Sequence, residues 1–142
     1  MPQLGVVIDN LTALKLLYLQ DNDMLLPVCR DGNSVGISFL VANGQTAGVG
    51  YRYLNNFEGR IALFCNESSE YTMLFEGNRT KLPNVPGRAL VQIDKATYEC
   101  QMYLAFDGDK EYERVQNIQK YVTSCNERYV GMNARVIPEI PK

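Results

Sequence analysis

The sequence predicts an α/β protein with a three-layer, mostly parallel sheet. Two apolar runs, residues 4–8 and 36–42, lack the alternation of a half-exposed strand, which indicates strands covered on both faces. Between them, apolar residues recur at helical spacing: Leu11, Leu14, Leu17 and Tyr18. Strand, helix and strand in this order make a βαβ unit, with a third central strand expected near 60–65.

The remaining elements follow from periodicity and from turn-forming residues. Glycine, asparagine and aspartate interrupt the apolar segments, and prolines mark extended connections. In chain order we expect strand 4–9, helix 11–20, a short helix at 23–29, a turn at 30–34, strand 36–42, a flexible loop at 43–50, strand 60–65, a helix at 67–76 capped by Asn66 or Ser68, a connector at 81–87, a β-hairpin of 88–94 and 98–105, an amphipathic helix at 109–129 and an extended tail at 131–142.

Composition excludes several classes of function. The 142 residues are enough for one domain with a real core, and the net charge of −2 argues against a broad nucleic-acid surface. The chain has no histidine, so mechanisms that need a serine–histidine or cysteine–histidine pair are excluded. The four cysteines have no C-x-x-C spacing and are expected to be buried free thiols. No apolar run is long enough to cross a bilayer, so membrane association would need a partner or further sequence.

The first candidate site is the end of the first strand, at Asp9 and Asn10. Open α/β sheets bind ligands at the carboxyl ends of their strands, so Asp9 is placed to hold Mg²⁺ or a nucleotide-bound water. The alternative is a strand followed by an Asp or Asn cap on the next helix.

The end of the second predicted strand brings two more polar residues to the same edge, Asn43 and Gln45. Glycines follow them, but no Gly-Lys-[Ser/Thr] ending is present, so the loop does not match a phosphate-binding P-loop. Asn43 and Gln45 could orient a water molecule, or they could make local turn hydrogen bonds. Farther along, Asp107-Gly108-Asp109 could be a two-carboxylate site, although Gly between acids is more typical of a turn that enters a helix.

The ordered set of motifs resembles the second half of a FtsK/SpoIIIE-type ATPase domain, and more narrowly the ATPase modules of the type VII secretion motors EssC and EccC. The resemblance covers about residues 4–130, with 131–142 as a tail or linker. In this comparison residues 6–10 stand at the Walker B strand and 39–45 at the strand that ends in Ala-Thr-Gln. Asn56 and Arg60 fall on an Asn-x-x-x-Arg-Ile-Ala run, and residues 86–91 with 98–101 match a Pro-Gly-Arg hairpin whose second strand carries Glu-Phe-Gln.

The departures from this pattern bear on activity. The family uses ATP and Mg²⁺, but residues 1–8 cannot supply a Walker A loop, and without it the β- and γ-phosphates lose their main cradle. Asn10 stands at the position of the catalytic Glu, and an amide cannot take a proton at neutral pH. Asn43-Gly44 replaces the Thr of the sensor strand.

The resemblance implies two functions. The first is a degenerate ATPase-like module, without a cofactor of its own, that binds neighbouring modules, copies of itself or the C-terminal signal of a secreted protein. The second is half of a competent ATP-driven DNA or protein translocase whose Walker A part is missing from this chain. Either would act in the cytoplasm, on the inner face of the membrane as part of a larger motor. In hexameric relatives an arginine near Arg60 can face the neighbouring nucleotide; the alternative is a salt bridge with Glu58 or Glu67.

Two structural expectations complete the sequence-based predictions. The related domains place the Walker A strand between the sensor strand and the strand after it, so the sheet should have a gap there. Rearranged strands, direct pairing of the flanking strands or a strand from another copy could fill it. The first helix carries leucines on more than one face, so we expect Leu14, Leu17 and Tyr18 to contribute to a protein–protein contact, unless they are core.

Overall fold

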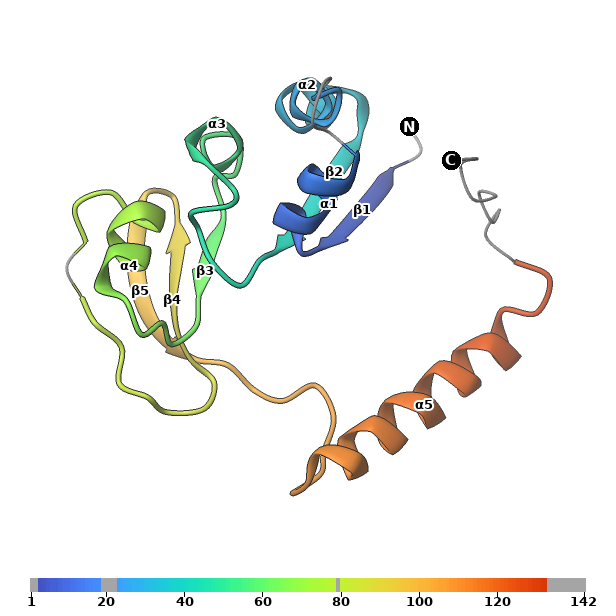
Figure 1. The fold of residues 1–142 in the computed structure, drawn as a ribbon. Helices are drawn as coiled ribbons and strands as arrows, with labels where there is room; N and C mark the ends of the chain where they lie inside the picture. Colours follow the sequence, from blue (N-terminus) through green and yellow to red (C-terminus); the bar gives the residue numbers. More distant parts are fainter. Residues whose placement is uncertain (1–2, 19–22, 79, 133–142) are drawn as a thin grey trace. The chain divides into compact units, whose positions relative to one another are not determined.

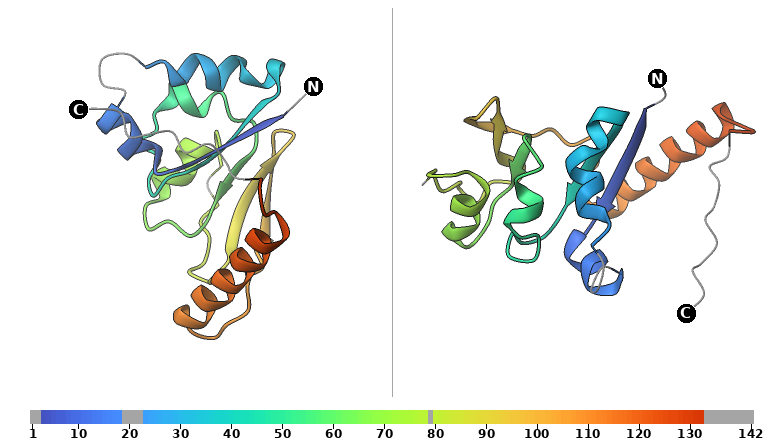
Figure 2. Two further views of the ribbon diagram at one scale, coloured as in Figure 1. Left: turned by 90° about the vertical axis from the view of Figure 1, so that its right-hand side faces the viewer. Right: turned by 90° about the horizontal axis from the view of Figure 1, so that it is seen from above.

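Strands β1 (Leu4–Asp9) and β2 (Ile37–Ala42) form a parallel pair, as the two apolar runs predict. Leu4 lies opposite Ile37, and Asp9 lies opposite Ala42. The computed structural model describes residues 3–18, 23–78 and 80–132 of the chain. Two compact units make up the chain, unit 1 (residues 1–102) and unit 2 (residues 103–142). Figure 1 labels their elements, and Figure 2 shows each unit from two further sides.

Helices pack on one face of the β1–β2 pair. They are α1 (Leu11–Tyr18), α2 (Leu25–Asp31), the 3-10 turn η1 (Gly32–Val35) and α3 (Tyr51–Leu54). The buried residues of this core are Ile8, Leu11, Val49, Tyr53 and Leu54. The predicted helices at 11–20 and 23–29 are confirmed, although residues 19–22 lie outside the described part. Helix α3 was not predicted, because four residues are too few to show a helical period.

A second sheet contains three antiparallel strands in the order β3–β4–β5: β3 (Arg60–Ala62), β4 (Arg88–Ile93) and β5 (Ala96–Gln101). Helix α4 (Ser68–Leu74) packs on it, and the core of this part contains Ala62, Tyr71, Phe75, Leu82 and Leu90. The side-chain cap expected for α4 is wrong. Glu67 occupies the cap position and makes no capping hydrogen bond through its side chain.

The predicted hairpin is confirmed, but its turn is shorter than expected. Asp94 and Lys95 both have positive φ, 49° and 67°, which is typical of a tight two-residue turn between twisted strands. Strand β5 therefore begins at Ala96. The Pro-Gly-Arg and Glu-x-Gln motifs meet at the other end, where Gln101 Nε2 donates to the carbonyl of Pro86 at 2.9 Å.

The α/β class is confirmed, with mixed sheets: one parallel pair and one antiparallel sheet. The expectation of a third central strand near residues 60–65 is wrong: β3 lies at the edge of the antiparallel sheet. In the described structure β2 and β3 do not pair, so direct pairing of these two strands is wrong as well. The faces opposite the helices are open, with Val7 74% and Leu40 66% exposed. The described elements of unit 1 therefore cover each sheet on one face, and a third layer is not among them.

The described part of unit 2 contains helix α5 (Glu111–Arg128) and the loop before it. The ring of Phe106 meets the ring of Tyr121 edge-on, with centroids 5.5 Å apart, and Arg114 donates to the carbonyl of Gly108 at 2.8 Å. The helix predicted at 109–129 is thus confirmed. Residues 133–142 of the predicted tail lie outside the described residues.

Candidate functional site

The edge formed by the carboxyl ends of β1 and β2 is the candidate site. Asn10 follows β1 with φ of 63°, a left-handed conformation that asparagine tolerates better than most residues. Its Oδ1 accepts the N–H of Ala13 at 3.0 Å, so Asn10 caps α1. The helix-cap alternative is the arrangement that the structure shows. Asp9 is exposed, and its carboxylate makes no hydrogen bond or ion pair to the described residues.

Asn43 reaches the same helix terminus from β2, so the prediction that these polar residues share one edge is confirmed. Its Oδ1 accepts the N–H of Thr12 at 3.0 Å, across 31 positions of sequence, and its Nδ2 donates to the carbonyl of Gln45. Two amide side chains from two strands thus satisfy two of the free N–H groups of α1. The Gln45 side chain is exposed and makes no hydrogen bond to a described residue.

The loop after β2 is held by contacts that the sequence does not reveal. Lys15 of α1 donates through Nζ to the carbonyls of Gly48 and Val49, at 3.2 and 3.0 Å. Buried Thr46 donates its N–H and its hydroxyl to one oxygen of Glu70, at 2.7 and 2.6 Å. The loop that we expected to be flexible is therefore tied to α1 and to α4. No sequence motif marks a lysine that donates to backbone carbonyls or a glutamate that accepts from a backbone N–H group. The contacts of Lys15 and Glu70 can therefore be recognised only from the fold.

These groups do not fit a magnesium-bound nucleotide. Phosphate sites at helix N-termini use free N–H groups and a lysine, but Thr12 and Ala13 donate to amides and Lys15 donates to carbonyls. Within the described ranges no cluster of three or more His, Cys, Asp or Glu residues could hold a metal ion. Among the residues that the structure describes, Asp9 is the one acidic side chain that the ends of β1 and β2 bring to this edge.

Arg60 lies at the start of β3 and binds backbone carbonyls. Its guanidinium donates to the carbonyls of Phe57 at 3.0 Å, Leu74 at 2.7 Å and Leu54 at 3.0 Å. The expected salt bridge to Glu58 or Glu67 is absent from the described residues, whose ion pairs are Arg30–Asp31 and Arg88–Glu99. Arg60 therefore joins the end of α3 to the end of α4.

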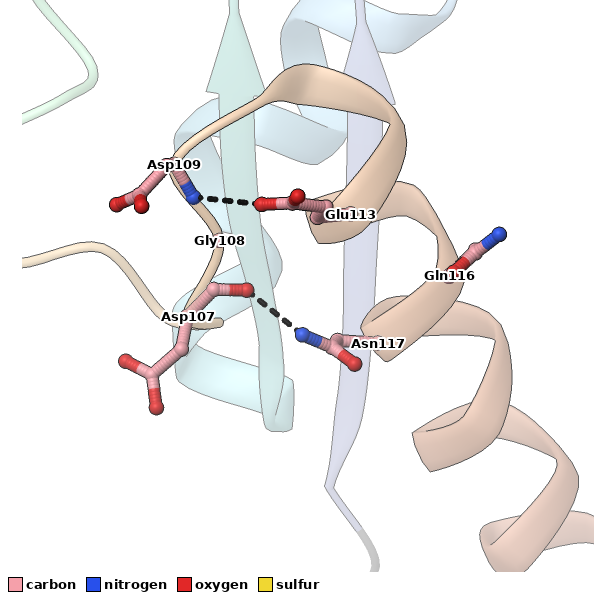
Figure 3. A pocket seen from close by; sticks show the side chains of 6 residues that line it. All are labelled: Asp107, Gly108, Asp109, Glu113, Gln116 and Asn117. Atoms are coloured by element: carbon pink, nitrogen blue, oxygen red, sulfur yellow. Dashed lines mark hydrogen bonds between the residues drawn. The ribbon is translucent and has the colours of Figure 1, made fainter.

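The Asp107-Gly108-Asp109 segment is the entry to α5. One oxygen of Glu113 accepts the N–H groups of Asp109 at 3.0 Å and Lys110 at 3.2 Å, and Asn117 donates to the carbonyl of Asp107 at 2.8 Å. The hydrogen bond from Lys110, followed by that from Tyr112, holds the pKa of Glu113 below its usual value. In Figure 3 the carboxylates of Asp107 and Asp109 point away from the helix and do not converge. The segment is a helix-entry turn.

The predicted contact residues of α1 differ in their surroundings. Leu14 packs against the first core, whereas Leu17 and Tyr18 are 71% and 67% exposed.

All four cysteines are free and partly buried, and burial, followed by the charge of Asp23, raises the pKa of Cys29. Among the helices that the structure describes, none has the length and apolar character needed to cross a membrane.

The sequence of the chain is similar to segments of known secretion proteins. No protein-family model matches the chain. It is 28% identical over 142 residues to the ESX secretion system protein EccC of Geobacillus thermodenitrificans (strain NG80-2), and 25% identical over 143 residues to YukB of Bacillus subtilis (strain 168). These matches cover 99% and 100% of the chain but 10% of each relative.

Solved structures agree with the sequence matches. The fragment of Geobacillus thermodenitrificans EssC that contains ATPases 2 and 3 superposes with a TM-score of 0.81 at 28% identity, over 99% of the chain and 27% of that fragment. The chain is homologous to one segment of the EssC/EccC secretion proteins. A structure of the cytoplasmic domain of EssC also matches, with a TM-score of 0.64 at 27% identity, over 99% of the chain and 31% of that domain. The resemblance to EssC/EccC modules predicted from the motifs is thereby confirmed.

Proposed function

We propose that this chain is a non-catalytic ATPase-like module that acts through protein–protein contacts in a type VII secretion motor. The observation that carries the proposal is the first turn of α1, where Asn10 and Asn43 accept the N–H groups that a phosphate would need. An amide also stands directly after Asp9, where the resemblance implies a catalytic acid. In the described residues, the N–H groups of Thr12 and Ala13 are therefore not free to bind an anion, and the amide of Asn10 cannot act as a general base.

Titration calorimetry with ATP and Mg²⁺ tests the catalytic part of the proposal. We expect no saturable binding at millimolar nucleotide, and the same trace for wild type and Asp9→Asn. The competing function is half of a competent translocase, and the exposed, unpaired carboxylate of Asp9 favours it. Micromolar affinity that is lost in Asp9→Asn would establish that function and overturn the non-catalytic one.

The contact surface that we propose is the end of α1, at Leu17 and Tyr18. Both side chains are largely exposed, although the helix packs Leu11 and Leu14 into the first core. Exposed apolar side chains that lie together mark interaction sites more often than isolated ones do. The partner that we propose is a neighbouring ATPase module, because the relatives are about ten times longer than this segment. Like the cytoplasmic domain of EssC, the module would then act on the cytoplasmic side.

A binding assay with a purified two-ATPase EssC fragment tests this surface. We expect Leu17→Asp to weaken binding at least about tenfold, because a charge would replace an apolar contact. Ile93→Asp is the matched control, since Ile93 is an exposed apolar residue of the other sheet. Equal loss in both variants, or no loss in Leu17→Asp, would contradict the proposal.

A further inference from the structure

Asn43 is the one asparagine of the sequence that a glycine follows. In such a pair the backbone nitrogen of the glycine can attack the side-chain carbonyl carbon of the asparagine, because glycine has no Cβ to hinder the approach. The cyclic imide that forms then opens with water to aspartate or isoaspartate. Whether the folded chain promotes this reaction depends on what Asn43 and Gly44 contact.

The side-chain carbonyl of Asn43 is held against the start of α1. Its Oδ1 accepts the N–H of Thr12 at 3.0 Å. The first N–H groups of a helix carry partial positive charge. A negative charge that develops on Oδ1 during attack at Cγ is therefore stabilised, as in an oxyanion hole. The side-chain nitrogen, which has to leave, donates to the carbonyl of Gln45 in the loop.

The attacking nitrogen of Gly44 is not engaged elsewhere. In the part of the chain that the structure describes, the N–H of Gly44 makes no hydrogen bond. The φ of Gly44 lies outside the left-handed region, and a Cβ at this position would meet nothing within 4 Å. All groups that the reaction needs thus come from Asn43, Gly44 and one N–H of α1. Neither a partner nor another part of the longer relatives is required.

We propose that Asn43 is a deamidation site of the folded chain, at which the N–H of Thr12 stabilises the oxyanion. Hydroxide removes the proton of the Gly44 nitrogen, this nitrogen bonds to Cγ of Asn43, and the bond from Cγ to Nδ2 breaks, so that ammonia leaves. One water molecule then opens the imide at either carbonyl and leaves aspartate or isoaspartate at position 43. No group is oxidised or reduced. This inference goes beyond the proposed function and does not depend on it.

The reaction changes the loop after β2 more than it changes α1. A carboxylate at position 43 still accepts the N–H of Thr12, and negative charge is favourable at this end of a helix. It cannot donate to the carbonyl of Gln45, so the hydrogen bond at the start of the loop is lost. Conversion to aspartate therefore loosens the loop while α1 keeps its cap.

Peptide mapping by mass spectrometry, after incubation of the full chain at mildly alkaline pH, tests the reaction. We expect residue 43 to gain the mass of an amide-to-acid conversion, and hydroxylamine to cleave the chain between residues 43 and 44 because it traps the imide. Gly44→Ala is the matched control, since the fold has room for its Cβ. We expect conversion to be at least about tenfold slower in this variant, because the methyl group hinders the approach of the nitrogen. No conversion in the wild type, or equal rates in a folded Gly44→Ala, would overturn the proposal.

The same mapping in urea tests the contribution of α1. In the unfolded chain Asn43 and Gly44 are still neighbours, but the N–H of Thr12 is no longer held at Oδ1. We expect conversion to be at least about threefold slower there than in the folded chain. A rate in urea that equals or exceeds the folded rate would show that α1 does not promote the reaction and would refute the proposal.

Hydrogen exchange on Asn43→Asp, which carries the aspartate product, measures the consequence for the loop. We expect faster exchange in residues 44–49 than in the wild type, with exchange in α1 unchanged. Exchange that stays unchanged in the loop, or that rises in α1, would contradict the effect assigned to the modification.

Discussion

The side-chain oxygens of Asn10 and Asn43 accept neighbouring N–H groups at the start of α1, those of Ala13 and Thr12, each at 3.0 Å. One amide comes from the end of β1, and the other comes from the end of β2. The two side chains thus make α1 dependent on the β1–β2 pair, and they occupy the positions that an anion would take at a helix N-terminus.

Removing either amide should destabilise unit 1 without altering nucleotide affinity. We expect Asn10→Ala and Asn43→Ala each to lower the free energy of unfolding by about 1 kcal/mol, the usual cost of losing a helix cap. Urea denaturation followed by circular dichroism gives the values. Asn33→Ala serves as a control, because Asn33 is exposed and makes no side-chain hydrogen bond to the described residues. A variant that gains ATP binding would show that the amides mask a working anion site.

Arg60 should contribute to stability through the three carbonyls that it binds. In Arg60→Ala the partly buried carbonyls of Phe57 and Leu74 lose the donor that Arg60 supplies, whereas that of Leu54 keeps the N–H of Phe57. We expect a loss of about 2–3 kcal/mol in unfolding free energy. Arg60→Lys should recover only part of it, because an ammonium cannot reproduce the guanidinium fork. The alternative role facing a neighbouring nucleotide predicts an unchanged isolated chain and a defect confined to an assembled motor.

Gly48 should not tolerate a larger residue, because Thr12 leaves no room for a Cβ at this position. A Cβ at this position would lie 2.1 Å from Oγ1 of Thr12, whereas a Cβ at Gly44 in the same loop would meet nothing within 4 Å. We expect Gly48→Ala to cost about 1–3 kcal/mol and Gly44→Ala less than about 0.5 kcal/mol, measured by thermal and urea unfolding. Thr12→Ala should partly rescue Gly48→Ala in a double-mutant cycle. Equal effects of the two glycine substitutions would argue that the contact with Thr12 is not rigid.

Tyr53 should make stability fall at alkaline pH. Burial, and then the hydrogen bond that its hydroxyl donates to Asp23, raise the pKa of Tyr53 above its usual value, so the folded chain keeps the phenol neutral. The resulting stabilisation is fully present below the unfolded value of about 10 and is lost as the pH rises towards the folded value. Tyr53→Phe should therefore show a smaller loss of stability between pH 9 and pH 11. Tyr51→Phe, at an exposed tyrosine, should follow the wild type.

Local sequence patterns determined most of the secondary structure. The apolar runs near residues 4–9 and 36–42 identified β1 and β2, the helical spacing after Asn10 identified α1, and the alternation around residues 88–101 identified the hairpin. Each of these signals lies within one element, because burial acts on residues that are neighbours in the sequence, either as an unbroken apolar run or as a helical or alternating period. The ordered motifs also sufficed to indicate the EssC/EccC resemblance.

Only the tertiary structure decided what the polar residues of the candidate site do. Thr12 and Asn43 are 31 positions apart, Thr46 and Glu70 are 24 apart, and Arg60 reaches a carbonyl 14 positions away. A sequence shows which groups can donate or accept, but the choice among partners depends on which segments the fold brings within about 3 Å. For that reason Asp9, Asn43 and Arg60 could be singled out from the sequence, whereas the roles of Lys15 and Glu70 could be recognised only once the strands and helices were assembled.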